Sequence, residues 1–252
     1  MIRTDFLQET NDKKIIERKK HFTIVEYQRD ISVTPETAIS AYYAGQMNVR
    51  KRQAVVELSG SDVILQAGAM QWMAGAVEVA TNVKGVGDFA KKLIGSKVTN
   101  ESAIKPRYHG SGLLVLEPTY RHLLLEDLSD WDGGMVIEDG LFLACDGSVN
   151  MKTVARSTFS SAALGNEGLF NSMMTGSGLV LLESQVPREE LVMVEIENDV
   201  LRIDGSYAIA WSHSLKFTVE RTTKTLIGSA ASGEGLVNVY RGTGKVLMAP
   251  IM

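Results

Sequence analysis

Three glutamates stand at matching places along the sequence, and carboxylates are groups that could perform acid or base chemistry. Glu101, Glu167 and Glu234 each precede a Gly-(Ser/Thr)-Gly triplet by eight or nine residues, and a short apolar run follows each triplet. If the three carboxylates converged in space, they would shift one another's pKa values. We favour a structural role, in which each glutamate accepts hydrogen bonds from backbone N–H groups in its own turn.

Histidine and cysteine, the other residues that commonly carry chemistry, are scarce. His21, His109, His122 and His213 lie far apart and lack the spacings of metal ligands. A metal site formed by His109 and His213 meeting in space is an alternative that we disfavour. Cys145 lies in the apolar run LFLACDG, so we expect a buried thiol in a reducing compartment rather than a nucleophile.

Glycine-rich motifs give no better indication of catalysis. Gly85, Gly87 and Ala90 fit a loosened dinucleotide-binding pattern, but the preceding strand is weak and no parallel βαβ unit surrounds them. A connector turn accounts better for these residues. The sequence contains neither a P-loop nor a G-x-S-x-G elbow. We therefore predict no catalytic, cofactor-binding or metal-binding residue, and no cofactor.

Composition and charge describe an ordinary globular protein. The chain has 252 residues, a hydrophobic fraction of 44%, a net charge of −4 and one cysteine. Dedicated nucleic-acid binders usually carry a basic domain, so the overall charge disfavours that class. The N-terminus lacks the apolar core of a signal peptide, and no apolar run approaches the roughly 18 to 20 residues of a membrane span. We expect a cytoplasmic protein without a membrane span.

Short apolar segments separated by glycines predict an all-β fold. Residues 54–73, 133–146 and 190–211 can each be aligned as strand, glycine turn and strand, and the turn glycines are Gly68, Gly140 and Gly205. Such dense turns are typical of antiparallel sandwiches or barrels. With the recurring triplets, they predict one compact domain, 1–252, built from tandem repeats at about 22–110, 111–176 and 177–252.

Helices are expected only in connectors. Pro35 follows two candidate capping residues, Ser32 and Thr34, and predicts a short helix that ends at Gly45. A second short helix is predicted over residues 88–96. Residues 1–20 are charged and are expected to form a helical turn or a frayed tail, and a strand begins at His21.

Three segments in order resemble a known family. These are VILQAGAMQWMAGAVEV, NEGLFNSMMTGSGLVLLE and SGEGLVNVYRGTGKVLMAP, and the resemblance covers residues 50 to 252. The chain is similar to the mitochondrial-biogenesis family named for altered inheritance of mitochondria. That resemblance implies a fold like that of the tryptophan RNA-binding attenuation protein, a small β-sandwich that forms rings. Pro106 departs from the pattern and implies an edge or bulge. The resemblance implies no catalytic residues.

Three functions from different classes are compatible with these observations. We favour a non-enzymatic scaffold or binding protein that forms a homo-oligomer, since repeated sheet edges must be paired or covered. The alternative is a single-stranded RNA-binding module, for which the basic run Arg50, Lys51 and Arg52 is the local support. The third is an enzyme or small-ligand protein with an unknown ligand. We expect Trp72 and Trp211 to pack in a core or interface rather than on bases.

Overall fold

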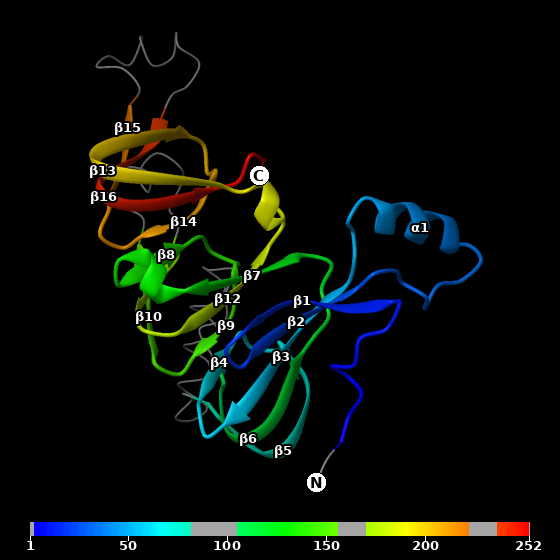
Figure 1. The fold of residues 1–252 in the computed structure, drawn as a ribbon. Coiled ribbons are helices and arrows are strands. Elements are labelled where there is room, and N and C mark those ends of the chain that lie inside the picture. Colours follow the sequence, from blue (N-terminus) through cyan, green and yellow to red (C-terminus); the bar gives the residue numbers. More distant parts are fainter. Residues whose placement is uncertain (1–2, 82–104, 156–169, 222–235, 252) are drawn as a thin grey trace, which may run out of the picture.

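The computed structural model describes residues 3–81, 105–155, 170–221 and 236–251, which form a mostly β protein. The predicted all-β class is confirmed. The described strands form two sheets, and every strand pair in them is antiparallel. The first sheet curls into a nearly closed barrel and the second forms a half-barrel (Figure 1).

The barrel sheet contains nine strands, and the half-barrel sheet contains seven. The nine are β1 Lys13–Lys19, β2 Phe22–Tyr27, β3 Arg52–Ser59, β4 Val63–Leu65, β5 Met70–Ala80, β6 Arg107–Leu116, β7 His122–Asp127, β9 Phe142–Asp146 and β12 Leu179–Ser184. The seven are β8 Gly134–Ile137, β10 Val149–Ala155, β11 Phe170–Gly176, β13 Val192–Asp204, β14 Ala208–Ser212, β15 Lys216–Arg221 and β16 Leu236–Met248.

Each Gly-x-Gly triplet lies on or between strands, and both of its glycines have positive φ. The φ values are +116° and +156° at Gly110 and Gly112, and +120° and +158° at Gly242 and Gly244. The residues before the triplets, in β6, β11 and β16, pair with β5, β10 and β15, respectively. The residues after the triplets, in β6, β12 and β16, pair with β3, β7 and β13. Glycine is required there because a Cβ at positive φ is strained.

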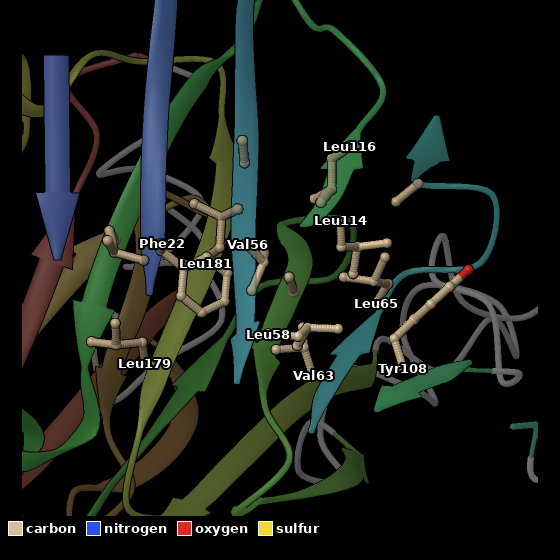
Figure 2. Packing of buried hydrophobic residues seen from close by; sticks show 14 of the residues in the cluster. Phe22, Val56, Leu58, Val63, Leu65, Tyr108, Leu114, Leu116, Leu179 and Leu181 are labelled. Carbon is tan, nitrogen blue, oxygen red and sulfur yellow. The ribbon is translucent and has the colours of Figure 1, made fainter. Parts of the chain in front are cut away.

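Side chains between the strands form successive apolar cores. The first core fills the barrel and combines Phe22 and Val56 with Leu179 and Leu181 of β12, which lie far along the chain (Figure 2). The second core surrounds Trp131, and the third surrounds Trp211 and Tyr240. Burial of this kind contributes about 25 cal/mol per Å² of apolar surface. The expected packing role of Trp211 is confirmed.

The predicted helix near Pro35 is confirmed, with shifted ends. The helix α1 spans Ala38–Gln46. The backbone N–H of Ala38 donates to the carbonyl of Thr34 at 2.9 Å, so a turn at Pro35 precedes the helix. The N-cap residue is Thr37 rather than Ser32 or Thr34, and its side chain makes no capping hydrogen bond. Within the described residues, no helix is long and apolar enough to cross a membrane. The helix predicted over 88–96 falls outside the described residues.

The expectation for the N-terminal segment was wrong. Residues 13–19 form the strand β1, which pairs with β2 from Lys13↔Tyr27 to Lys19↔Phe22. A neighbouring strand therefore overrides the local preference of a charged sequence. Pro106 stands just before β6, and its carbonyl accepts a hydrogen bond from the backbone N–H of Leu65 at 3.0 Å. Proline is tolerated there because it lies at the start of the strand.

The turn between β1 and β2 is tied to the end of β7. The Nζ of Lys20 lies 3.0 Å from Oδ2 of Asp127, and the hydroxyl of Ser129 donates to Oδ1 at 2.8 Å. Burial alone would raise the pKa of Asp127, but these hydrogen bonds lower it to about 2. The folded pKa is therefore below the ordinary value of 3.8, so the bonds stabilise the fold above that pH and are lost as pH falls towards 2.

Asp127→Asn is expected to reduce the free energy of unfolding at pH 7 by about 1 to 2 kcal/mol. The difference from the unsubstituted protein should shrink between about pH 4 and pH 2. Urea unfolding at several pH values measures it. Asp130→Asn is the control, because Asp130 is exposed and lies 4.0 Å from Lys19. A pH-independent effect of Asp127→Asn would contradict the prediction.

Candidate functional site

The clearest surface feature is an arm, residues 29–51, that leaves the barrel between β2 and β3. Those strands pair as far as Glu26↔Arg52, and the arm carries α1 away from both sheets (Figure 1). Residues 37–49 contain no charged side chain. Gly45 is the one buried residue of α1. A helix of nine residues is marginal in water without packing against a partner.

Apolar side chains of the arm are exposed to solvent. Tyr42 and Tyr43 are each 64% exposed, and Met47 is 78% exposed. Ile31, Val33, Ile39 and Val49 are exposed as well. The tyrosine rings contact each other edge to face at a centroid distance of 5.4 Å. Several exposed apolar side chains close together in one segment indicate an interaction site.

Arginines fix the base of the arm to the barrel through one buried carboxylate. The Nη1 of Arg50 lies 3.0 Å from Oε1 of Glu26, and the Nη2 of Arg52 lies 2.7 Å from Oε2. Arg52 also donates to Oδ1 of Asn48 at 2.8 Å. Arg52 and Glu26 are both buried, so each charge is compensated by the other and by hydrogen bonds.

A second set of contacts closes the other side of the base. Asp30 accepts from Nζ of Lys51 at 3.0 Å and from the hydroxyl of Tyr120 at 2.8 Å. Burial opposes ionisation of Asp30, but these two bonds outweigh it and lower its pKa. The same bond to Asp30 raises the pKa of Tyr120. Asp30 is therefore an anchor that is ionised at neutral pH with its oxygens engaged, rather than a base ready to accept a proton.

A cavity of about 420 Å³ lies between α1 and the base of the arm. Its lining includes Arg29, Lys51 and Tyr120, together with Ser32, Thr37 and Ser40. Arg29 is paired with Asp12, and Ser40 donates to the carbonyl of Thr37 at 2.9 Å. Neither histidine nor cysteine is among the described residues that line it. The chemistry available there is hydrogen bonding and packing.

The basic run Arg50, Lys51 and Arg52 lies at this base. All three cations have carboxylate partners within 3.0 Å, and Arg52 is buried. Phosphate groups would have to compete with those carboxylates, so the run is not a free cationic patch.

The other residues considered from the sequence are dispersed. His109 lies 3.3 Å from Glu78 in the barrel sheet, whereas His213 follows β14 beside Gly133 in the half-barrel. Among the described residues, no cluster of three or more His, Cys, Asp or Glu side chains could hold a metal ion. Burial raises the pKa of the Cys145 thiol to about 12, and the predicted burial of Cys145 is confirmed. Glu101, Glu167 and Glu234 lie outside the described residues.

Reading the sequence missed the exposure of the arm. The available signal was the uncharged segment 37–49, which contains Ile39, Tyr42, Tyr43, Met47 and Val49. A surface helix normally carries charged residues on a polar face, and α1 contains no charged residue. A mostly apolar helix without charged residues indicates a buried or partner-bound segment.

Comparisons with known proteins agree with this β architecture. The chain is 29% identical over 195 residues to an uncharacterized protein of Streptococcus pyogenes serotype M6, which covers 74% of this chain and 76% of the relative. A crystal structure of protein SPYM3_0169 from Streptococcus pyogenes superposes with a TM-score of 0.58 at 25% identity, covering 81% of this chain and 90% of that one. The family model described as mitochondrial biogenesis AIM24 matches residues 46–251, so the chain belongs to the AIM24 mitochondrial biogenesis family.

Proposed function

We propose that the protein is a non-enzymatic scaffold that works as a homo-oligomer, with the arm as one of its contact surfaces. The observation that carries this proposal is α1, a nine-residue helix that exposes Tyr42, Tyr43 and Met47 and has one buried residue. Such a helix gains stability chiefly by burying its apolar side chains against a partner.

The chemistry of the arm favours a second copy of this chain over a membrane surface or a nucleic acid. Membrane-surface helices carry lysines and arginines on a polar face, and residues 37–49 carry no charge. The cations at the base are paired with Glu26 and Asp30. Obligate interfaces between identical chains are more apolar than the rest of the surface and are depleted in charge at their centre. Residues 37–49 of the arm have that composition.

The proposed oligomer predicts a mass in solution above 27.5 kDa, measured by size exclusion with light scattering. Replacing Tyr42, Tyr43 and Met47 together by serine should shift the mass towards that of smaller species. We expect the association to weaken at least tenfold, because a loss of about 1.4 kcal/mol of binding free energy is enough to raise the Kd tenfold. Ile16→Ser is the control, because Ile16 is 48% exposed on β1 and does not belong to the arm. A clean monomer for the unsubstituted protein at micromolar concentration would refute the oligomer.

We also infer that three groups of strands are copies of one ancestral unit. The support is that β6, the β11–β12 pair and β16 carry the Gly-x-Gly triplet and pair with equivalent neighbours on both sides of it. These registers favour units at 52–116, 122–184 and 192–248 over the bounds expected from sequence. The likeness to the attenuation protein and the cytoplasmic location stay predictions.

RNA binding stays the alternative prediction, with less local support than the scaffold. The run Arg50, Lys51 and Arg52, which motivated it, is engaged by carboxylates. A filter assay for salt-dependent binding of single-stranded RNA discriminates between the two functions.

A further inference from the structure

The strand groups defined above are joined through two contacts that share one register. The first, second and third groups are residues 52–116, 122–184 and 192–248. In the first joint, β4 pairs with β9, and in the second, β8 pairs with β14. The pairs are Val63↔Asp146, Ile64↔Cys145 and Leu65↔Ala144 in the first joint, and Met135↔Ser212, Val136↔Trp211 and Ile137↔Ala210 in the second.

The backbone hydrogen bonds at the two joints are equivalent as well. In the first, Gln66 N–H donates to the carbonyl of Leu143 at 2.8 Å, and Gly147 N–H donates to that of Asp62 at 2.7 Å. In the second, Glu138 N–H donates to the carbonyl of Ile209, and His213 N–H donates to that of Gly134, both at 3.0 Å. One geometry therefore joins consecutive groups twice within the chain.

The positions of the third such joint are fixed by pairing inside each group. Val63, Met135 and Leu201 each pair with the residue two places before the first triplet glycine. Met73, Cys145 and Trp211 each pair with the residue two places after the second triplet glycine. Residues 201–203 of β13 thus correspond to 63–65 and 135–137, and residues 72–74 of β5 correspond to 144–146 and 210–212.

These two edges have no strand partner of that kind within the described residues. There, β13 pairs only with β16 and β5 only with β6. They lie at opposite ends of the molecule, with β5 at the bottom and β13 at the top of Figure 1. They do not meet within one chain, and each presents backbone N–H and C=O groups that could extend a sheet.

Equivalent positions of the three groups differ in exposure, because among the described residues no strand of another group lies beside β5. Cys145 is 0% exposed and Trp211 is 2% exposed, because a strand of the preceding group lies beside each of them. Met73 occupies the same position in the first group and is 42% exposed. Met73 would become buried, and thereby stabilised, if a strand of another copy paired with β5.

We propose that β13 of one copy pairs with β5 of the next copy, in the register of the two internal joints. The pairs are Ile203↔Trp72, Arg202↔Met73 and Leu201↔Ala74. This inference rests on the proposed homo-oligomer and deepens it by naming a contact distinct from the arm. Because two different edges meet, the contact is head-to-tail and generates a ring or an open chain. Phe6 packs edge-on against Trp72 at 5.6 Å, so the incoming copy must accommodate or displace it.

Disulfide trapping between two single variants tests this register. Met73→Cys and Arg202→Cys are purified separately, mixed, and oxidised with diamide. Directly opposed residues of antiparallel strands have Cα atoms about 4.5 to 5.5 Å apart, which a disulfide can span. We expect a reducible dimer from the mixture and none from either variant alone. The native thiol of Cys145 is buried and should not compete.

Met73→Cys mixed with Asp204→Cys is the control for register, because a diagonal neighbour about 7 to 8 Å away is beyond disulfide reach. At least tenfold less dimer is expected from this control mixture. Equal dimer from both mixtures, or dimer from one variant alone, would overturn the proposed pairing. If light scattering shows an oligomer that depends on the arm and the first mixture gives no dimer, this contact fails while the proposed function stands. A monomer in both experiments removes both proposals.

Discussion

Gly110→Ala is expected to destabilise the protein by roughly 3 to 5 kcal/mol, the upper range for a single substitution. Gly110 has a φ of +116°, and a Cβ added there would lie 2.1 Å from the carbonyl oxygen of Ala76. That oxygen belongs to the backbone of β5, which pairs with β6 over this stretch and cannot move alone. The substitution therefore breaks the β5–β6 ladder or shifts its register. Urea unfolding followed by circular dichroism measures the loss.

Two kinds of glycine provide matched controls for that prediction. Gly68 has a φ of +82° and nothing within 4 Å of an added Cβ, so Gly68→Ala should cost only about 1 to 2 kcal/mol for the left-handed backbone. Gly242, which is equivalent to Gly110, has a φ of +120°, and its added Cβ would be 3.8 Å from Leu215. Its cost should resemble that of Gly68. Equal losses at Gly110 and Gly242 would show that steric contact with β5 is not the cause.

The second large effect is expected at Glu26. Glu26→Ala removes the carboxylate that pairs with Arg50 and with the buried Arg52, whose side chain is 3% exposed. A buried charge left without its partner typically costs about 3 to 5 kcal/mol. We expect a loss of that size in the free energy of unfolding at pH 7, together with faster proteolysis within the arm, because the carboxylate fixes its base to β2.

Glu220→Ala is the matched control for Glu26. Glu220 forms a two-bond ion pair with Arg241, in which Nη2 and Oε2 lie 2.8 Å apart, but both side chains are more than a third exposed. Exposed ion pairs contribute only about 0 to 1 kcal/mol. A loss at Glu220 as large as that at Glu26 would show that burial does not decide the strength of these pairs.

Turn chemistry made the short strands and the glycine turns between them predictable from sequence, whereas the pairing of distant strands was not predictable. Gly68, Gly140 and Gly205 all have positive φ, as turns between short apolar segments require. The pairing of β4 with β9 joins residues about 80 positions apart, and local patterns hold no information on such contacts. The strand at 13–19 was missed for a different reason. Its partner β2 is the next strand in the chain, but its charged sequence does not show a strand pattern, and pairing with β2 decides its conformation.

The candidate site was the least predictable part of the molecule. Arg50, Lys51 and Arg52 were found as a run, but their carboxylate partners Glu26 and Asp30 come from more than 20 residues earlier in the chain. A basic run in sequence is therefore not a basic surface. Exposure of Tyr42 and Tyr43 depends on α1 leaving the barrel, which helix propensity alone does not indicate.

The two ends of the arm are attached to the barrel at adjacent positions on the neighbouring strands β2 and β3. Tyr27 N–H donates to the carbonyl of Lys51 at 2.9 Å, so the two ends of the insertion are hydrogen-bonded neighbours. Loop-closure entropy grows only slowly with loop length when the ends are already adjacent. The position between Tyr27 and Lys51 is therefore a graft point, where the barrel would accept a shorter turn, a longer segment or a foreign domain.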